Sequence, residues 1–137
     1  MDLGIILDQT LALGADDWRS VLDFLKRIVN GLDVSAKPDG ARVGILRYTS
    51  TPSISLYFNT IRDENLTPYT VNNFIDRITQ IQGERRIDLA VPLAATVLFT
   101  ERGGSRPNAK KVGRPLTAIT SVFTFIAFFN LIPLDMG

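Results

Sequence analysis

The hydrophobic pattern at the start of the chain predicts a buried strand followed by an amphipathic helix. Residues 3–7 (Leu-Gly-Ile-Ile-Leu) are a short, almost uninterrupted apolar run, which is typical of a strand buried on both faces of a parallel sheet. From Ala15 to Leu32, apolar residues recur every three or four positions, at Trp18, Leu22, Leu25, Val29 and Leu32. This spacing predicts a helix whose single apolar stripe faces the core.

The next segment reads as two paired strands. Arg42–Tyr48 is rich in β-branched and aromatic residues, and Ser53–Phe58 begins with a strict alternation of polar and apolar positions. Such alternation is typical of a strand with one face in water. Because the loop between the two strands is so short, they must be antiparallel neighbours. We expect the second strand at an edge of the sheet.

Two further helices are predicted in the second half of the chain. Thr70–Ile81 places four apolar residues on one helical face, Val71, Phe74, Ile78 and Ile81, and Thr70 suits an N-cap. Ile87–Thr100 reads as a third helix, in which Pro92 is tolerable only near the first turn. A strand is expected to begin near Val112.

The last part of the chain differs in composition, because Leu116–Leu134 contains no charged residue. It is about long enough to cross a bilayer, with Lys110, Lys111 and Arg114 on one side. Its β-branched and aromatic residues equally suit a buried strand. A membrane segment, a replacement strand and a poorly folded tail all remain open. We therefore divide the chain into a domain of residues 1–112 and a divergent hydrophobic segment of residues 113–137.

Composition narrows the function classes. The 137 residues suit one domain, and fifteen Lys and Arg against fourteen Asp and Glu leave a net charge of +1. This balance is not that of a nucleic-acid-binding protein. Without cysteine there is no disulfide framework, and without histidine the commonest general base and zinc ligand are missing. The first residues show no signal peptide, so the chain is either cytosolic or a piece of a longer protein.

Motifs of α/β enzymes are also missing. The sequence has no dinucleotide-binding Gly-x-Gly-x-x-Gly, no phosphate loop and no nucleophile elbow. We therefore predict that the protein is not an enzyme and needs no catalytic cofactor. One modification motif is present at Asn65, in the sequon Asn-Leu-Thr, which has meaning only if the chain is secreted.

The order of these elements, together with their junctions, resembles the von Willebrand factor type A domain of matrix collagens, matrilins and integrin inserted domains. Asp2–Asp8 is similar to the family's first strand, Trp18–Leu32 to its first helix, and Arg42–Tyr48 to its second strand, Arg-Val-Gly-x-x-x-Tyr/Phe. Ile75–Gly83 followed by Arg86–Ala90 is similar to its second helix, glycine-containing loop and third helix. The resemblance implies a Rossmann-like α/β fold: a mainly parallel sheet with one antiparallel edge strand and flanking helices.

The resemblance also implies a metal-ion-dependent adhesion site, in which carboxylate and hydroxyl oxygens surround Mg²⁺. Asp8 matches the first acid and Thr10 the first hydroxyl of the family's Asp-x-Ser-x-Ser loop. Gln9 stands where the residue is usually small, and Ala12 stands where the second hydroxyl belongs and cannot bind a metal. By alignment, Arg85 occupies the position of a ligating Thr.

The family's last ligand, an acid after the fourth strand, is also missing where it is expected. After Val112 no acidic residue occurs before Asp135. At most two of the five expected ligand positions survive, those of Asp8 and Thr10. The chain therefore resembles a C-terminally truncated or alternatively ended form of the domain.

Three interpretations of Asp8 follow. It could serve as a turn or cap residue at the end of a strand, a common role of Asp. It could belong to a weak Mg²⁺ site with Thr10. Alternatively, Arg85 or Arg86 takes the place of the cation and pairs with Asp8, since a guanidinium beside a carboxylate favours the charged form of both.

The function implied by the resemblance is that of a non-catalytic adhesion module of extracellular-matrix or cell-surface type that binds a protein ligand. We expect the binding surface at a rim formed by Asp8–Leu13, Thr49–Ser53 and Gln82–Arg86. Within it, the candidate binding residues are Gln9, Ala12, Arg85 and Arg86. An intracellular scaffold domain of the same family and a membrane-tethered form are the alternatives.

Overall fold

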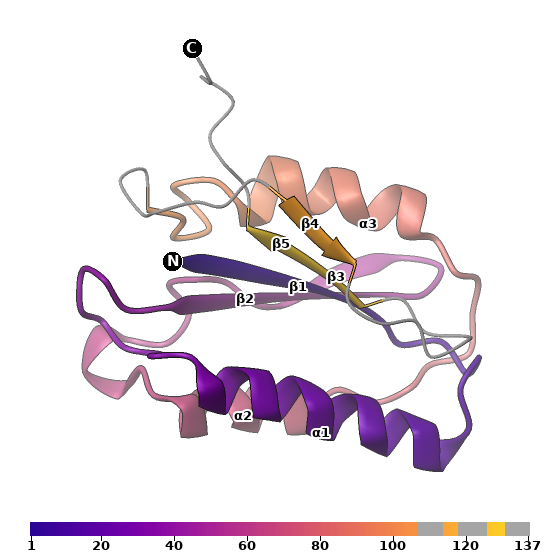
Figure 1. Cartoon of the computed structure of the whole chain (residues 1–137). Helices are drawn as coiled ribbons and strands as arrows, with labels where there is room; N and C mark the ends of the chain where they lie inside the picture. Colours follow the sequence, from indigo (N-terminus) through magenta and orange to yellow (C-terminus); the bar gives the residue numbers. More distant parts are fainter. Residues whose placement is uncertain (107–113, 118–125, 131–137) are drawn as a thin grey trace.

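The protein is an α/β sandwich whose central sheet lies between two layers of helices (Figure 1). The computed structural model describes residues 1–106 in full and residues 114–117 and 126–130 as backbone strands. The strands are β1 (Asp2–Asp8), β2 (Arg42–Tyr48), β3 (Pro52–Leu56), β4 (Arg114–Thr117) and β5 (Ile126–Asn130). The helices are α1 (Ala15–Gly31), the short η1 (Asp63–Asn65), α2 (Pro68–Asp76), α3 (Ile87–Leu93) and the π-helical η2 (Ala94–Leu98).

The five described strands form one mixed sheet in the order β3-β2-β1-β5-β4. β1 and β2 are parallel, with Ile5 opposite Ile45, and β3 pairs antiparallel with β2 at one edge. The predicted Rossmann-like fold with an antiparallel edge strand is thus confirmed. On the other side of β1, β5 and then β4 add antiparallel neighbours.

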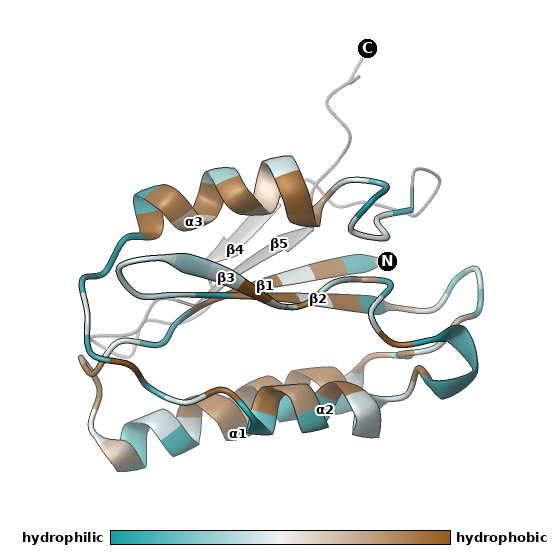
Figure 2. Cartoon of the chain, turned by 180° about the vertical axis from the view of Figure 1, so that it is seen from behind, coloured by the Kyte–Doolittle hydropathy of each residue, from teal (hydrophilic) through white to brown (hydrophobic). Residues whose placement is uncertain are grey.

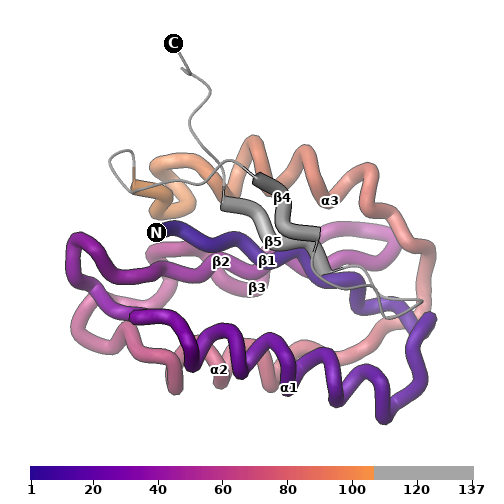
Figure 3. The backbone as a smooth tube through the Cα atoms, viewed as in Figure 1, coloured from indigo at the N-terminus to yellow at the C-terminus, as the bar shows by residue number. Residues whose placement is uncertain are grey.

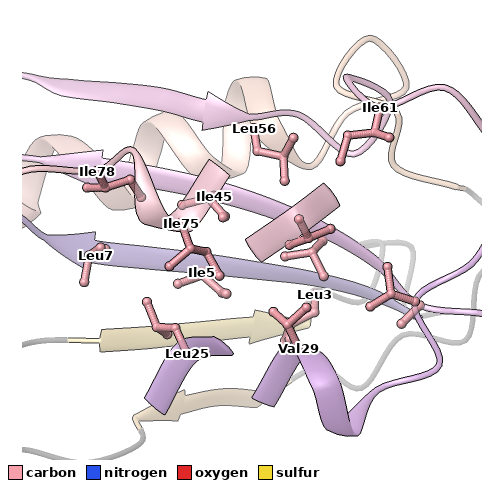
Figure 4. Close-up of a cluster of buried hydrophobic side chains, with 14 of the residues drawn as sticks. Leu3, Ile5, Leu7, Leu25, Val29, Ile45, Leu56, Ile61, Ile75 and Ile78 are labelled. Atoms are coloured by element: carbon pink, nitrogen blue, oxygen red, sulfur yellow. The ribbon is translucent and has the colours of Figure 1, made fainter. Parts of the chain in front are cut away.

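Alternation along the strands divides the core between the two faces of the sheet. On one face, Leu3, Ile5 and Leu7 of β1 pack with residues of α1 and α2 such as Leu25 and Ile75 (Figure 4). On the other face, the buried cluster comes from β1, β2, the segment after β3, α3 and η2 and contains Ile6, Leu46, Tyr48, Phe58, Ala90, Ala94 and Leu98. Figure 2 shows that the apolar middle of β1 and β2 lies between the helix layers. β1 is therefore buried along its whole length, as its apolar run predicts.

The predicted helix Thr70–Ile81 is wrong at both ends. Thr67, not Thr70, is the N-cap of α2: the two threonines form a capping box, and Pro68 follows at the first helical position. The helix ends at Asp76, and residues 77–86 then run past the end of β1 toward α3 (Figure 3). Ile81 therefore lies outside the helix and is exposed rather than in the core.

The predicted helix Ile87–Thr100 is also interrupted. α3 ends at Leu93, directly after Pro92, and the chain continues as the π-helical turn η2. Proline has no N–H to donate to the preceding turn, so it disrupts the α-helical hydrogen-bond pattern. Among the described residues, no helix combines the length and the apolar character needed to cross a bilayer. Most of Leu116–Leu134, including residues 118–125, lies outside the described residues, so the division of the chain at residue 112 stays a prediction.

Candidate functional site

The predicted rim lies at the carboxyl ends of β1 and β2, where three segments distant in sequence meet. The backbone N–H of Ile81 donates to the carbonyl of Gln9 at 2.7 Å, and the N–H of Arg86 donates to the carbonyl of Thr49 at 3.1 Å. The segment 77–86 is thereby attached to the ends of both strands. This end of a parallel strand pair is the usual place of ligand sites in open α/β sheets.

Asp8 is the central residue of the rim, and both of its carboxylate oxygens are engaged. Oδ1 accepts the backbone N–H of Thr10 at 2.8 Å, an arrangement typical of an Asp turn. Oδ2 accepts Nε of Arg85 at 2.6 Å, which makes an ion pair. The side chain of Asp8 is only 2% exposed, whereas that of Arg85 is 42% exposed. A buried carboxylate thus meets an arginine that reaches in from the surface.

Of the two arginines that the sequence offers, Arg85 is therefore the one that pairs with Asp8. The neighbouring Arg86 points its guanidinium elsewhere and donates from Nε and Nη2 to the two oxygens of Asp88, both at 3.0 Å. This hydrogen bonding lowers the pKa of Asp88 and raises that of Arg86. The pairing of Asp8 with an arginine, one of the three sequence-based interpretations, is present, and its Asp turn is present as well.

Thr10 and Ala12 follow Asp8 in the same loop. Thr10 is buried, and its hydroxyl accepts the backbone N–H of Ala12 at 3.4 Å. Ala12 carries no side-chain oxygen, so the position contributes only backbone. The hydroxyl of Thr10 thus helps to shape the loop.

Two glutamines fasten this loop to the segment after α2. Gln9 is buried; its Nε2 donates to the carbonyl of Thr79 at 2.9 Å, and its Oε1 accepts Nη1 of Arg47 at 3.2 Å. Gln80 donates from Nε2 to the carbonyls of Thr10 and Leu13. The large side chain at position 9 is therefore a structural link rather than an exposed binding residue.

Gly83 allows the rim segments to approach closely. A Cβ at this position would lie 2.7 Å from Oγ of Ser50 and 3.3 Å from its backbone nitrogen. Next to it, the N–H of Glu84 donates to the same Ser50 hydroxyl at 2.9 Å. A side chain at position 83 would push the loop away from β2 and move Arg85 with it.

Tyr48, at the end of β2, lies beneath the ion pair. It is fully buried, and burial raises the pKa of its phenol, with a further increase from the charge of Asp8 and a partial decrease from Arg85. The phenol therefore stays neutral, and the charged groups in direct contact beside it are Asp8 and Arg85.

Comparison with known proteins identifies the family. Residues 2–117 match the family model of the von Willebrand factor type A domain. The chain belongs to this family. The resemblance seen in the strand, helix and loop junctions is thus confirmed.

The relatives of this VWA domain include matrilins and vitrin. Matrilin-2 of Mus musculus is 28% identical over 119 residues, which cover 87% of this chain and 12% of matrilin-2. Matrilin-3 of Gallus gallus is 27% identical over 131 residues, covering 89% of this chain and 28% of that protein. Vitrin of Mus musculus is 25% identical over 112 residues, which cover 82% of this chain and 16% of vitrin. The chain spans less than a third of the length of each of these relatives.

A solved structure shares the fold. Proximal thread matrix protein 1 from the mussel byssus, solved with a zinc-occupied MIDAS (metal-ion-dependent adhesion site) motif, superposes on this chain with a TM-score of 0.68. Its sequence identity is 18%, and the match covers 80% of this chain and 26% of the mussel chain. At this identity the likeness shows the fold alone, so the metal site of the VWA domain has to be judged from the residues present here.

The residues of the VWA domain do not fit a divalent cation. Mg²⁺ requires about six oxygen ligands in an octahedron, whereas Oδ2 of Asp8 is held by Arg85 and the side chain of Ala12 has no ligand atom. Within residues 1–106, no three side chains of His, Cys, Asp or Glu gather where they could hold a metal ion. Asp135, the first acidic residue after Val112, lies outside the described residues.

Sequence reasoning did not single out two exposed apolar residues of the site. Leu11 lies within the predicted rim segment Asp8–Leu13 and is 55% exposed, and Ile81, which is 45% exposed, lies in the segment that bonds to Gln9. Leu11 follows Thr10 in a polar loop, a position that is solvent-exposed in most proteins. Ile81 fits a helical period, so the sequence pattern predicts it on the apolar face of a helix.

Proposed function

We propose that this VWA domain is a non-catalytic, protein-binding module of extracellular-matrix or cell-surface type. Its rim consists of backbone loops held by hydrogen bonds, and it displays apolar side chains beside an ion pair. Matrilins and vitrin, among its relatives, are secreted matrix proteins, and an intracellular role has no support from them. The chain is a small part of the length of such relatives, which is consistent with one module of a secreted protein.

One observation carries this proposal. Leu11 and Ile81 are exposed in the two segments that the bond between Ile81 and Gln9 joins, and the partly exposed Arg85 belongs to the second of these segments. Apolar side chains with an adjacent arginine are the residue types that dominate protein–protein interfaces, with polar groups around them. Glu84, Ser50 and Arg86 supply such a polar border, since the first two are exposed and Arg86 is partly exposed at the same rim.

Binding to purified matrix proteins tests the proposal. Fibrillar collagen, fibronectin and laminin are immobilised separately, and the dissociation constant of the domain for each is measured by biolayer interferometry. We expect saturable binding to at least one of them. Ile81→Asp and Leu11→Asp should each weaken that binding at least tenfold, because a carboxylate at a buried interface must be desolvated.

Tyr69→Asp is the matched control, since Tyr69 is an exposed aromatic residue in the first turn of α2, away from the rim. It should leave the dissociation constant unchanged. Equal loss of binding in Tyr69→Asp and the two rim variants would contradict a binding surface at the rim. Absence of binding to any of the three matrix proteins would contradict the proposed function.

A further inference from the structure

We propose that Arg85 is a built-in substitute for the divalent cation of this site, so that the rim of this VWA domain is held in one conformation without any metal. The guanidinium neutralises Asp8 and ties the segment 77–86 to the end of β1. This inference rests on the proposed function only in its consequence for partner binding, which would need no divalent cation.

The burial of Asp8 requires a positive partner. Its side chain is 2% exposed, and a buried carboxylate without a counter-charge is strongly unfavourable. The distance of 2.6 Å between Nε of Arg85 and Oδ2 of Asp8 is that of a charge-assisted hydrogen bond. Arginine remains charged at every physiological pH, so this counter-charge is permanent, unlike a metal ion that depends on its concentration.

Arg85 and a cation would compete for the same oxygen. Oδ1 of Asp8 accepts the backbone N–H of Thr10, and Oδ2 is the oxygen that the guanidinium contacts. A divalent ion at Oδ2 would have to displace the guanidinium and would be repelled by its charge while it remained near. Ala12, which lacks the second hydroxyl, removes a ligand that could offset this repulsion.

The backbone on either side of Arg85 is anchored independently. Before it, Ile81 is bonded to Gln9 and Glu84 to Ser50, and after it, Arg86 is bonded to Thr49. Because these bonds position the chain at residue 85, its side chain can reach Asp8 with little loss of conformational freedom on pairing. The ion pair and the anchored backbone together hold the loops against one another without a metal ion.

A metal titration tests the inference on the whole domain. Binding of Mg²⁺ and Mn²⁺ is measured by isothermal titration calorimetry, and Tm is measured in 5 mM MgCl₂ and in 5 mM EDTA, on the order of concentrations that saturate weak sites. The wild-type domain should give no binding heat and the same Tm in both buffers. A Tm that rises with Mg²⁺ or falls with EDTA would overturn the inference.

Two double variants separate Arg85 from its neighbour. Arg85→Thr with Ala12→Ser should gain Mn²⁺ or Mg²⁺ binding and a metal-dependent rise in Tm, because the competing charge is gone and both hydroxyls are present. Arg86→Thr with Ala12→Ser restores the same hydroxyl but leaves Arg85 in place, and it should stay inert to metal. Metal binding by the Arg86 control would overturn the inference. So would the absence of metal binding by the Arg85 double variant, provided that circular dichroism shows this variant to be folded.

Arg85→Lys covers the case in which the double variant does not fold. It retains a positive charge near Asp8, so it should remain folded and indifferent to metal, whereas Arg85→Met should have a lower Tm than Arg85→Lys. Equal Tm values for these two variants would overturn the role of the charge. If the domain shows no response to metal and also binds no matrix protein, the result would support this inference and contradict only the proposed function.

Discussion

The ion pair at the other end of β1 allows a quantitative prediction about stability. Asp2 is buried at the start of the strand, with its side chain 1% exposed, and its carboxylate accepts Nε of Arg106 at 2.9 Å and the backbone N–H of Arg106 at 2.7 Å. Nη2 of Arg106 also donates to the carbonyls of Met1 and Gly40, at 2.9 and 3.0 Å. This side chain therefore joins the chain after η2 to the starts of β1 and β2.

Replacing Arg106 with Ala should destabilise the domain strongly. Removing one partner of a buried ion pair costs about 3–5 kcal/mol, because the remaining charge is left without compensation. Here the cost should be lower, since the side chain of Arg106 is 21% exposed and the backbone N–H of residue 106 still reaches Asp2. We expect a loss of roughly 2–4 kcal/mol in the free energy of unfolding, against a typical total of about 5–15 kcal/mol.

Urea denaturation followed by circular dichroism measures this loss, with the midpoint and slope fitted separately. Arg86→Ala is the matched control, because it removes an arginine whose partner Asp88 is exposed; exposed pairs add little, so the midpoint should not change measurably. A loss below about 1 kcal/mol in Arg106→Ala, which is the range of surface ion pairs, would refute the argument from the burial of Asp2.

Three further predictions concern other parts of the molecule. Tyr48 has a raised pKa because it is buried and near Asp8, so its contribution to stability is fully present below about pH 10 and is lost as the pH rises through the folded-state value. Tyr48→Phe should therefore make the fall of Tm above about pH 10 less steep, as measured by circular dichroism, and an unchanged pH dependence would contradict this. Gly44→Ala should lower the free energy of unfolding, measured by urea denaturation, by about 1–3 kcal/mol. The added Cβ would lie 2.9 Å from Leu98 and 3.1 Å from Phe58. The control Gly31→Ala adds a Cβ that meets nothing within 4 Å, so it should be neutral or stabilising. If the domain is made in a secretory cell, the exposed Asn65 should carry a glycan on part of the molecules, seen as a gel shift that endoglycosidase and Asn65→Gln both abolish; an unshifted secreted protein would contradict this.

Much of the fold could be predicted because its signals are local and strong. The apolar run of β1, the regular stripe of α1 and the short loop between β2 and β3 each appear within a few consecutive residues. The run of β1 indicates a strand buried on both faces, the stripe of α1 indicates a helix buried on one side, and the short loop indicates that β3 pairs with β2 at an edge. The confirmed fold class follows from these elements together with the family's junctions.

The segment after α2 could not be predicted in the same way. Ile81 matches a helical spacing by position alone, but the chain there is extended because its backbone bonds to Gln9 and its neighbour Gln80 bonds to the β1 loop. Tertiary hydrogen bonds thus outweighed a local helical preference. Similarly, α3 ends next to Pro92. Whether a proline is tolerated depends on how far it lies from the start of the helix, and the sequence alone does not fix that start.

The sequence by itself determined what chemistry the site lacks. An alanine at position 12 and an arginine at position 85 contribute no side-chain oxygen ligand in any fold, because side-chain composition does not depend on conformation. The tertiary structure alone decided which arginine meets Asp8. Arg85 and Arg86 are adjacent and chemically identical, and Arg85 lies 77 positions after Asp8. Only the bonds of the surrounding backbone to β1 and β2 direct one guanidinium inward to the buried carboxylate and the other outward to Asp88.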